Sequence, residues 1–560
     1  MLLASRLRIF SSIGKALHVS SRVLNNEDSV KRAIETGDVS SFPERFNFTR
    51  DVVDLWAKHE SPLRKSVPAL WMIQDGRSKT YTYRELSQIS KRIAGVFHNY
   101  GIKKGDRILL CLPKCPEYWF IMLGLVRCGI EFTSITTQAT GYDLRYRIER
   151  FTPKMVISNK ISDVDFATVN TEVEYKMSIS YEGVGWMSLT SLMESAGDFD
   201  GYNTSLNDPA IVFFTSGTTG KPKMVEHTHS YLLAHVITGK RLYFLKHTDV
   251  FWCLADTGWA KVAYATFSTW LYRACAFVDT SARFSPYDVL KVLQDYPITK
   301  FCAPPTVYRQ LINKESGLFN FKALNDCVSA GEPLNPEALH AWKALTNIYI
   351  REGYGQTETI VVACAPYGSV VKPGSMGLPL KECQVVILND DLSPVKQGEV
   401  GQLALSMSPV KPIGLLKGYR DAEDKNADAF KNGYYLTGDK VYQDEDGYLW
   451  FVSRADDIII SAGYRIGPFE IESVLLEHPA VVESAVVGVS DPDRFEIVKA
   501  FIVLAENYTS YDHDKLANEI QEFVKQRTAP YKYPRQIEFV NSLPKTMSGK
   551  IQRNILRQKK

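Results

Sequence analysis

The sequence predicts an α/β protein, with a large N-terminal domain of helix-covered β-sheets and a small α+β C-terminal domain. Three observations support this fold class. The chain has 560 residues, which is too long for one ordinary hydrophobic core. Helical and strand-like segments alternate from about residue 40 to 200, as expected where helices cover sheets. The last hundred or so residues form a compact segment that is long enough for a small domain.

The elements are predicted from the spacing of apolar residues. Leu86, Ile89, Ile93 and Val96 share one face of an amphipathic helix. Continuous apolar runs between turn signals predict buried strands. Helices are therefore expected over 83–98, 117–128, 229–243, 470–476 and 516–527, and strands over 107–112, 211–214, 250–254, 480–489 and 500–504.

Composition excludes several classes of protein. Hydrophobic residues make up 45% and charged residues 23% of the chain, which is typical of a soluble globular enzyme. The longest apolar run, near Trp119 to Val126, is interrupted by Arg127 and is too short for a transmembrane segment. The nine cysteines lack Cys-x-x-Cys spacing, so free thiols in a reducing compartment are favoured over disulfides or zinc.

The first 26 residues have the composition of a targeting segment. They contain Arg6, Arg8, Lys15 and Arg22, many serines and no acidic residue. This pattern predicts a mitochondrial transit peptide over residues 1–26 and a location in the matrix. A secretory signal is disfavoured because two arginines interrupt its apolar centre. Without these four charges the formal net charge of +3 becomes about −1, which gives no reason to expect nucleic acid binding.

Residues 210–223 change abruptly from a strand to a polar loop. Gly217 and Gly220 allow close approach of the backbone to a ligand, and Lys221 and Lys223 supply positive charge. This composition indicates a phosphate-binding loop, although the spacing is not that of a Walker A motif. The alternative is a polar hairpin turn.

The loop resembles the AMP-binding signature of the acyl-adenylate-forming enzymes, which include acyl-CoA synthetases, luciferases and the adenylation domains of peptide synthetases. The resemblance implies an ATP site, with substrates ATP, coenzyme A and a small carboxylic acid. On the loop, it implies ATP binding by Thr215, Ser216, Gly217, Thr218, Thr219, Gly220, Lys221, Pro222 and Lys223.

Two further strand-then-loop segments match the same family. By resemblance, the turn after the strand that starts at Asp326 lies along the adenine. In the second loop, Tyr354 offers an aromatic face to the purine, Thr357 a hydroxyl to the α-phosphate, and Glu358 a hard oxygen to Mg²⁺. The implied ATP-binding residues are Gly331, Glu332, Pro333, Glu352, Gly353, Tyr354, Gly355, Gln356 and Thr357.

The resemblance also assigns the ribose site and a hinge. Asp439 matches the carboxylate that binds the ribose, since its two acceptor oxygens suit two vicinal hydroxyls. Alone, it could be an aspartate that ends a strand at a turn. Arg454 matches a ribose contact, although it could be only an ion-pair partner of Asp457. Asp456 matches the hinge.

By resemblance, the chain comprises an ATP- and acyl-binding domain over 40–453, a hinge over 454–457 and a small mobile domain over 458–560. Lys550 follows Ser548 and Gly549 on a loop and matches the catalytic lysine, which acts with Thr357 and Glu358. Arg465 would contact the nucleotide. The implied coenzyme A contacts are Ala462, Gly463, Tyr464, Arg494, Lys525, Tyr533, Pro534 and Arg535.

Within the family, the chain looks most like medium-chain acyl-CoA synthetases of mitochondria. The implied reaction forms acyl-AMP from a carboxylate and MgATP, and then transfers the acyl group to coenzyme A. Trp259 and Gly355 would line the acyl pocket. The alternatives are that Trp259 is a core residue that only buries apolar area, and that Gly355 is present because the turn requires a positive φ. An enzyme that charges a carrier protein and a non-catalytic binding protein remain rival functions.

Overall fold

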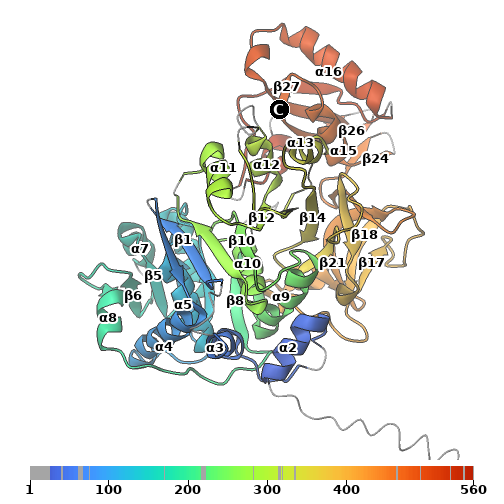
Figure 1. Cartoon of the computed structure of the whole chain (residues 1–560). Coiled ribbons are helices and arrows are strands. Elements are labelled where there is room, and N and C mark those ends of the chain that lie inside the picture. The colour runs from blue at the N-terminus through green and yellow to red at the C-terminus, as the bar shows by residue number, and fades with distance from the viewer. Residues whose placement is uncertain are drawn as a thin grey trace, which may run out of the picture.

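The computed structural model describes residues 26–558 except 40–41, 61–66, 75, 170, 216–221, 282, 313–316, 318, 333, 335, 462–463, 492–493, 530 and 547–548. The predicted transit peptide therefore lies outside the described residues, apart from Asn26. The predicted α/β class is confirmed, with the strands arranged in three sheets (Figure 1).

The first sheet has eight strands among the described residues and carries the polar loop. It is parallel from β8 through β4, β3, β5 and β6 to β7. In order across the sheet, the strands are β19 (Gly418–Arg420), β9 (Lys223–Thr228), β8 (Pro209–Thr215), β4 (Glu131–Ser134), β3 (Arg107–Cys111), β5 (Met155–Ser158), β6 (Tyr175–Ser178) and β7 (Met187–Ser188).

The second sheet has fourteen described strands and is parallel from β14 through β13, β12, β10 and β11 to β1. In order, the strands are β17 (Val385–Leu388), β18 (Gly401–Ser406), β21 (Tyr434–Gln443), β22 (Leu449–Arg454), β16 (Ser375–Pro379), β15 (Val361–Cys364), β14 (Ile350–Gly355), β13 (Asp326–Ala330), β12 (Lys300–Ala303), β10 (Val250–Cys253), β11 (Cys275–Asp279), β1 (Leu70–Gln74) and β2 (Arg77–Tyr81), with β20 (Phe430–Lys431) beside β21.

One hydrophobic core joins these two sheets. It contains buried side chains from both sheets and from four helices packed between them. These helices are α4 (Tyr83–Asn99), α5 (Pro116–Arg127), α9 (His229–Arg241) and α10 (Ala260–Leu271). The sequence predicted helices at α4, α5 and α9 but not at α10. Thr82 forms a capping box with Glu85 at the start of α4.

The remaining helices of the large domain are short and mostly amphipathic. They are α2 (Asn26–Thr36), α3 (Asp54–Lys58), α6 (Gly141–Phe151), α7 (Ile161–Thr168), α8 (Leu189–Ser195), α11 (Pro286–Asp295), α12 (Pro305–Leu311), α13 (Pro336–Thr346) and α14 (Glu423–Ala429). Within the described ranges, none of the helices is long and apolar enough to cross a membrane. All nine cysteines are free, as predicted.

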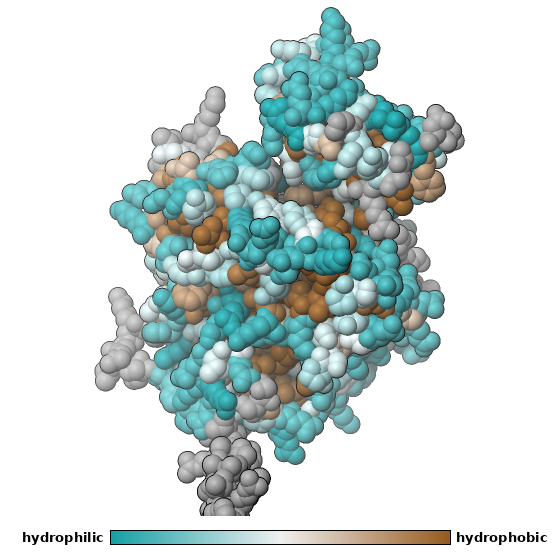
Figure 2. Space-filling view, turned by 90° about the vertical axis from the view of Figure 1, so that its right-hand side faces the viewer, coloured by the Kyte–Doolittle hydropathy of each residue, from teal (hydrophilic) through white to brown (hydrophobic). Residues whose placement is uncertain are grey.

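The C-terminal residues form a third sheet with its own core. The sheet order is β24 (Tyr464–Ile466), β23 (Ile459–Ser461), β26 (Phe495–Leu504) and β25 (Val481–Asp491), with β27 (Gln536–Phe539) beside β26. Its helices are α15 (Pro468–Leu476), α16 (His513–Arg527) and α17 (Arg553–Gln558). Figure 2 shows this domain as a largely hydrophilic lobe, with hydrophobic residues gathered below it.

Two predicted boundaries in this domain were wrong for clear reasons. Helix α16 begins at His513 rather than at residue 516, because the side chain of Asp512 accepts hydrogen bonds from the amides of Asp514 and Lys515. Strand β26 begins at Phe495 rather than at residue 500, because it pairs along its whole length with β25.

Candidate active site

The polar loop closes a β-hairpin. Strands β8 and β9 are antiparallel, and Thr215 at the end of β8 pairs with Lys223 at the start of β9. Lys223 is half-buried, and burial lowers the pKa of its ammonium. The hydroxyl of Tyr146 donates a hydrogen bond to the carbonyl oxygen of Pro222 at 2.9 Å. The other predicted residues of this loop lie outside the described residues: Ser216, Gly217, Thr218, Thr219, Gly220 and Lys221.

The second predicted loop follows β13, and the third follows β14. Because these two strands are parallel neighbours, both loops leave the same edge of the sheet, where ligands bind in open α/β sheets. Gly331 has φ +103, a conformation that favours glycine. Beside it, the ammonium of Lys261 donates to the carbonyl of Ala330 at 2.6 Å. Glu332 is half-buried, and Pro333 lies outside the described residues.

Glu352 is a buried carboxyl beside this turn. The amide of Leu334 donates to its Oε2 at 3.0 Å, whereas its Oε1 has no hydrogen-bond partner among the described residues. Burial raises the pKa of Glu352 to about 8, so the carboxyl is mostly protonated at pH 7. The neighbouring Gly353 is also buried.

Asp439 is the centre of a hydrogen-bonded cluster. The Tyr354 hydroxyl and the Gln356 amide both donate to its Oδ2, the latter at 2.7 Å. Arg454 donates to its Oδ1 at 2.9 Å. The predicted ribose carboxylate and three other predicted nucleotide contacts are therefore brought together, although they come from different strands.

Two of the alternatives considered from sequence are wrong. Asp439 does not end a strand, because β21 continues to Gln443. Arg454 does not pair with Asp457, whose carboxylate lies 2.6 Å from the guanidinium of Arg557. The Arg454 side chain instead contacts Asp439 and lies 3.7 Å from the carboxylate of Asp456.

The positive-φ explanation for Gly355 is also wrong, because Gly355 is absent from the residues with positive φ. A different constraint applies. A Cβ atom at this position would lie 2.6 Å from the carbonyl oxygen of Ile360, which is closer than real Cβ atoms approach backbone atoms. A register shift between Tyr354 and Gly355 brings the two chain segments together here. Glycine is therefore required by close backbone approach.

Thr357 and Glu358 follow on the same loop and are both half-buried. The hydroxyl of Tyr419 donates to Oε1 of Glu358 at 2.9 Å. The ammonium of Lys223 lies 5.5 Å from the centre of the Tyr419 ring, so Tyr419 contacts both the start of β9 and Glu358. One carboxylate fits Mg²⁺, which in phosphate-binding sites is held by one or two carboxylates together with substrate oxygens and water.

The predicted hinge lies between two anchored residues. On its large-domain side, Arg454 is bound to Asp439. On its small-domain side, Asp457 is 7% exposed and is paired with Arg557 at 2.6 Å and with Arg553 at 3.6 Å, both from α17. The only residues between the two anchors are Ala455 and Asp456.

Among the described residues predicted to contact coenzyme A, only Tyr464 is exposed, and the others are half-buried or buried. The ring of Tyr464 stacks on Tyr531 with centres 4.1 Å apart. The ammonium of Lys525 lies 4.4 Å from the centre of the Tyr533 ring, and Arg535 donates to the Tyr533 hydroxyl at 3.1 Å. Arg494 donates its amide to Asp491, and Pro534 is buried. Ala462, Gly463 and the side chain of Arg465 lie outside the described residues.

Lys550 is exposed and lies shortly before α17. Its amide donates to the Thr546 hydroxyl at 3.2 Å, and its carbonyl accepts from the Thr546 amide at 2.8 Å. The bridge between Lys545 and Ile551 closes this turn. The main chain of Lys550 is thus fixed, whereas the residue is exposed.

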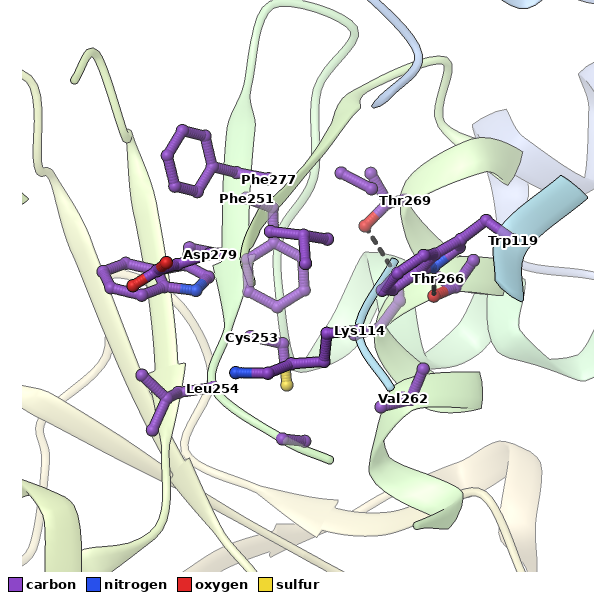
Figure 3. A pocket seen from close by; sticks show the side chains of 15 residues that line it. Lys114, Trp119, Phe251, Cys253, Leu254, Val262, Thr266, Thr269, Phe277 and Asp279 are labelled. Carbon is purple, nitrogen blue, oxygen red and sulfur yellow. Dashed lines mark hydrogen bonds between the residues drawn. The ribbon is translucent and has the colours of Figure 1, made fainter. Parts of the chain in front are cut away.

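That Trp259 and Gly355 line an acyl pocket stays a prediction. Trp259 is half-buried just before α10 and belongs to none of the cores of the described residues, so the alternative of a core tryptophan is wrong. Figure 3 shows a pocket that is lined partly by residues of α10. Neither Trp259 nor Gly355 lines it. Its lining includes Lys114, Trp119, Phe251, Leu254, Val262 and Asp279.

Four residues that hold the site were not predicted: His227, Tyr264, Tyr419 and Tyr435. Each bonds to the loop over residues 356–359. They lie 61 to 130 residues away from their partners in the sequence. No local sequence signal indicates these contacts.

The chain matches known proteins over most of its length. The model of the AMP-binding enzymes matches residues 61–420, and that of the AMP-binding enzyme C-terminal domain matches residues 470–550. The chain is 42% identical to acyl-coenzyme A synthetase ACSM3, mitochondrial, from Homo sapiens, over 99% of this chain and 96% of the relative. It is also 42% identical to acyl-coenzyme A synthetase ACSM4, mitochondrial, from Rattus norvegicus, over 92% and 90% respectively.

Solved structures with the same fold are also similar. An anthranilate CoA ligase, AuaEII, in complex with anthranoyl-AMP has a TM-score of 0.83 and 27% identity, covering 93% of this chain and 98% of that chain. An acyl-CoA synthetase from Brucella canis has a TM-score of 0.71 and 31% identity, covering 94% and 98%.

Proposed function

The chain belongs to the AMP-binding enzyme family, and we propose that it is a mitochondrial ligase that joins a medium-chain fatty acid to coenzyme A. It uses ATP and coenzyme A. The finer parts of the proposal are the medium-chain acid, Mg²⁺, cleavage of the segment over 1–26 and a location in the matrix.

The observation that carries the proposal is the cluster around Asp439. Tyr354, Gln356 and Arg454 all bond to this carboxylate, at the edge of the sheet where the β13 and β14 loops emerge. Oδ2 accepts two hydrogen bonds and Oδ1 accepts one, so Oδ1 keeps an acceptor site for a ribose hydroxyl, and a second ribose hydroxyl would replace one of the donors on Oδ2. This cluster supports an adenine nucleotide at the site.

In the first half-reaction, the acid attacks the α-phosphate of ATP and gives acyl-AMP and pyrophosphate. Two anions must approach, so positive charge and hydrogen-bond donors have to neutralise them. We assign this role to Lys223, the Thr357 hydroxyl and Lys550. Glu358 would hold Mg²⁺, which supplies positive charge to the phosphates when bound.

In the second half-reaction, the thiol of coenzyme A attacks the acyl carbonyl and AMP leaves. We propose that the small domain over 458–560 turns against the large domain over 40–453 about the hinge over 454–457. The anchors on Arg454 and Asp457 support a rotation at Ala455 and Asp456. The turn would withdraw Lys550 and bring the coenzyme A residues of the small domain to the site.

Incubation with ATP and octanoate, with and without coenzyme A, tests the proposal. We expect octanoyl thioester and AMP when coenzyme A is present, and none of the thioester when it is absent. Acyl-AMP that is formed but never passed to coenzyme A would instead support an enzyme that charges a carrier protein. No AMP under any condition would support a non-catalytic binding protein.

A further inference from the structure

Two side chains, the buried His227 and the half-buried Tyr264, bind the main chain of the loop over residues 356–359. Nε2 of His227 lies 2.7 Å from the carbonyl oxygen of Thr357. The hydroxyl of Tyr264 lies 2.6 Å from the carbonyl oxygen of Gln356 and 2.5 Å from that of Thr359. Because a carbonyl oxygen can only accept, the imidazole and the hydroxyl are the donors. The hydroxyl proton serves one of its two carbonyls at a time.

These donors cannot easily move, because they stand in a row of packed rings. The His227 side chain is 1% exposed and stacks on Tyr231 with ring centres 3.9 Å apart. His235 follows, with its ring 4.6 Å from Tyr231 and 4.8 Å from Tyr264. The row connects β9, α9 and α10, so the positions of both donors are set by the core of the large domain.

Two further tyrosines hold the same loop by hydrogen bonds to its side chains. Tyr419 donates to Glu358, as described above, and the hydroxyl of Tyr435 donates to Oε1 of Gln356 at 3.0 Å. The carbonyls of Gln356, Thr357 and Thr359 are therefore bound by the two core donors, whereas the side chain of Glu358 is held by Tyr419.

We propose that His227 and Tyr264 are positioning residues for the formation of acyl-AMP. By binding the carbonyls of the loop, they present the Thr357 hydroxyl to the α-phosphate and the Glu358 carboxylate to the metal. This inference rests on the proposed function. Without His227 the Thr357 carbonyl loses its donor, and without Tyr264 the Thr359 carbonyl loses its donor, although the Gln356 carbonyl keeps the amide of Thr359. The loop then shifts to recover the lost bond.

The matched variants are His227→Leu and Tyr264→Phe, which remove the donors, and Tyr231→Phe as the control. The Tyr231 hydroxyl is buried without a hydrogen-bond partner among the described residues, so its loss changes the packing of the same rings but removes no bond to the loop. His227→Gln restores an N–H donor. Tyr264→Phe removes only a hydroxyl and keeps the aromatic ring. It therefore still tests the proposal if His227→Leu fails to fold.

The first measurement is the rate of octanoyl-AMP formation by the full chain. We expect kcat to fall about tenfold in His227→Leu and Tyr264→Phe, because a lost positioning bond of about 1.4 kcal/mol has this effect. KM for ATP should stay within twofold, and His227→Gln should recover most of the rate. Rates within twofold of the Tyr231→Phe control in both variants would overturn the proposal.

The second measurement does not depend on activity. Amide hydrogen exchange of a peptide that covers 353–361 should be faster in His227→Leu and Tyr264→Phe than in Tyr231→Phe. Unchanged exchange in both variants would overturn the positioning role. A wild-type chain that forms no octanoyl-AMP, but whose variants show the faster exchange, would argue against the proposed function and leave the positioning of the loop standing.

Discussion

Asp439 in the large domain and Lys550 in the small domain differ in how their functional atoms are held. Asp439 is 4% exposed, and donors from three side chains fix its two oxygens. Lys550 is exposed, and its turn fixes only the main chain. Similarly, Glu358 is held by Tyr419, whereas Tyr464 on the small domain is 50% exposed.

The difference teaches how one site can serve two reactions. Groups that bind the nucleotide are needed in both half-reactions, so a fixed arrangement on the large domain costs the enzyme no reorganisation. Groups needed in only one half-reaction can be carried on a domain that turns. Variants in each domain can test whether the groups on the large domain and those on the small domain serve different half-reactions in this way.

The largest effect is expected at the proposed hinge. Asp456→Pro fixes φ near −65° at one of the two residues between the anchors, so one half-reaction should fall by about a hundredfold or more while the other survives. Adenylation is the step expected to survive. Single-turnover assays of each step measure this. Asp456→Ala, which removes the carboxylate but keeps the backbone free, is the control and should retain both steps. If the proline variant performs both steps normally, the domains do not turn at this residue.

The next effect concerns the large domain and Gly355. Any Cβ here meets the Ile360 carbonyl, so Gly355→Ala should lower activity about tenfold or more with acetate and octanoate alike. If this position lines the acyl pocket, Gly355→Trp should lose more octanoate activity than Gly355→Ala does. The additional loss of acetate activity in Gly355→Trp should be smaller. Measured kcat/KM values for both acids decide between these possibilities. Equal losses in the tryptophan variant would exclude the pocket role.

A smaller effect is expected in the stability of the nucleotide half. The carboxyl of Glu352 ionises near pH 8 in the folded chain and near 4.5 in the unfolded chain. The unfolded state therefore releases its proton first, and stability should fall by about 1.4 kcal/mol per pH unit from about pH 5 to 8. Glu352→Gln should remove this part of the slope. Unfolding by urea across this pH range measures it, with the exposed Glu337→Gln as control; an unchanged slope contradicts the assignment.

The smallest effect is expected on the surface of the small domain. Lys525→Ala removes a cation that lies over the Tyr533 ring. We expect KM for coenzyme A to increase severalfold. This is the size of effect that the loss of one exposed cation–π or ionic contact would have on binding. KM for ATP and the melting temperature should not change. A rise in KM for ATP of the same size would place Lys525 in the nucleotide half.

The sequence allowed much of this organisation to be predicted. Amphipathic spacing gave helix α4, and apolar runs between turns gave strands β8 and β10, because these signals are local. The order of the motifs indicated which loops form the nucleotide site. The cluster on Asp439 confirms that Tyr354, Gln356 and Arg454 are neighbours.

Other features could not be predicted because they depend on contacts between distant segments. The bond between His227 and the Thr357 carbonyl joins residues 130 positions apart. The reason for Gly355 is a neighbouring backbone, which no rule about turn residues reveals. The partners of Arg454 and Asp457 likewise depend on how β21 and α17 pack, and nearby opposite charges in the sequence suggested the wrong pair.

The most direct test of the two-part site is Lys550→Ala, measured separately in each half-reaction. If Lys550 stabilises charge only while the acid attacks ATP, formation of acyl-AMP should fall about a hundredfold or more. Thioester formation from synthetic acyl-AMP and coenzyme A should continue at a near-normal rate. Equal loss in both half-reactions would contradict the account.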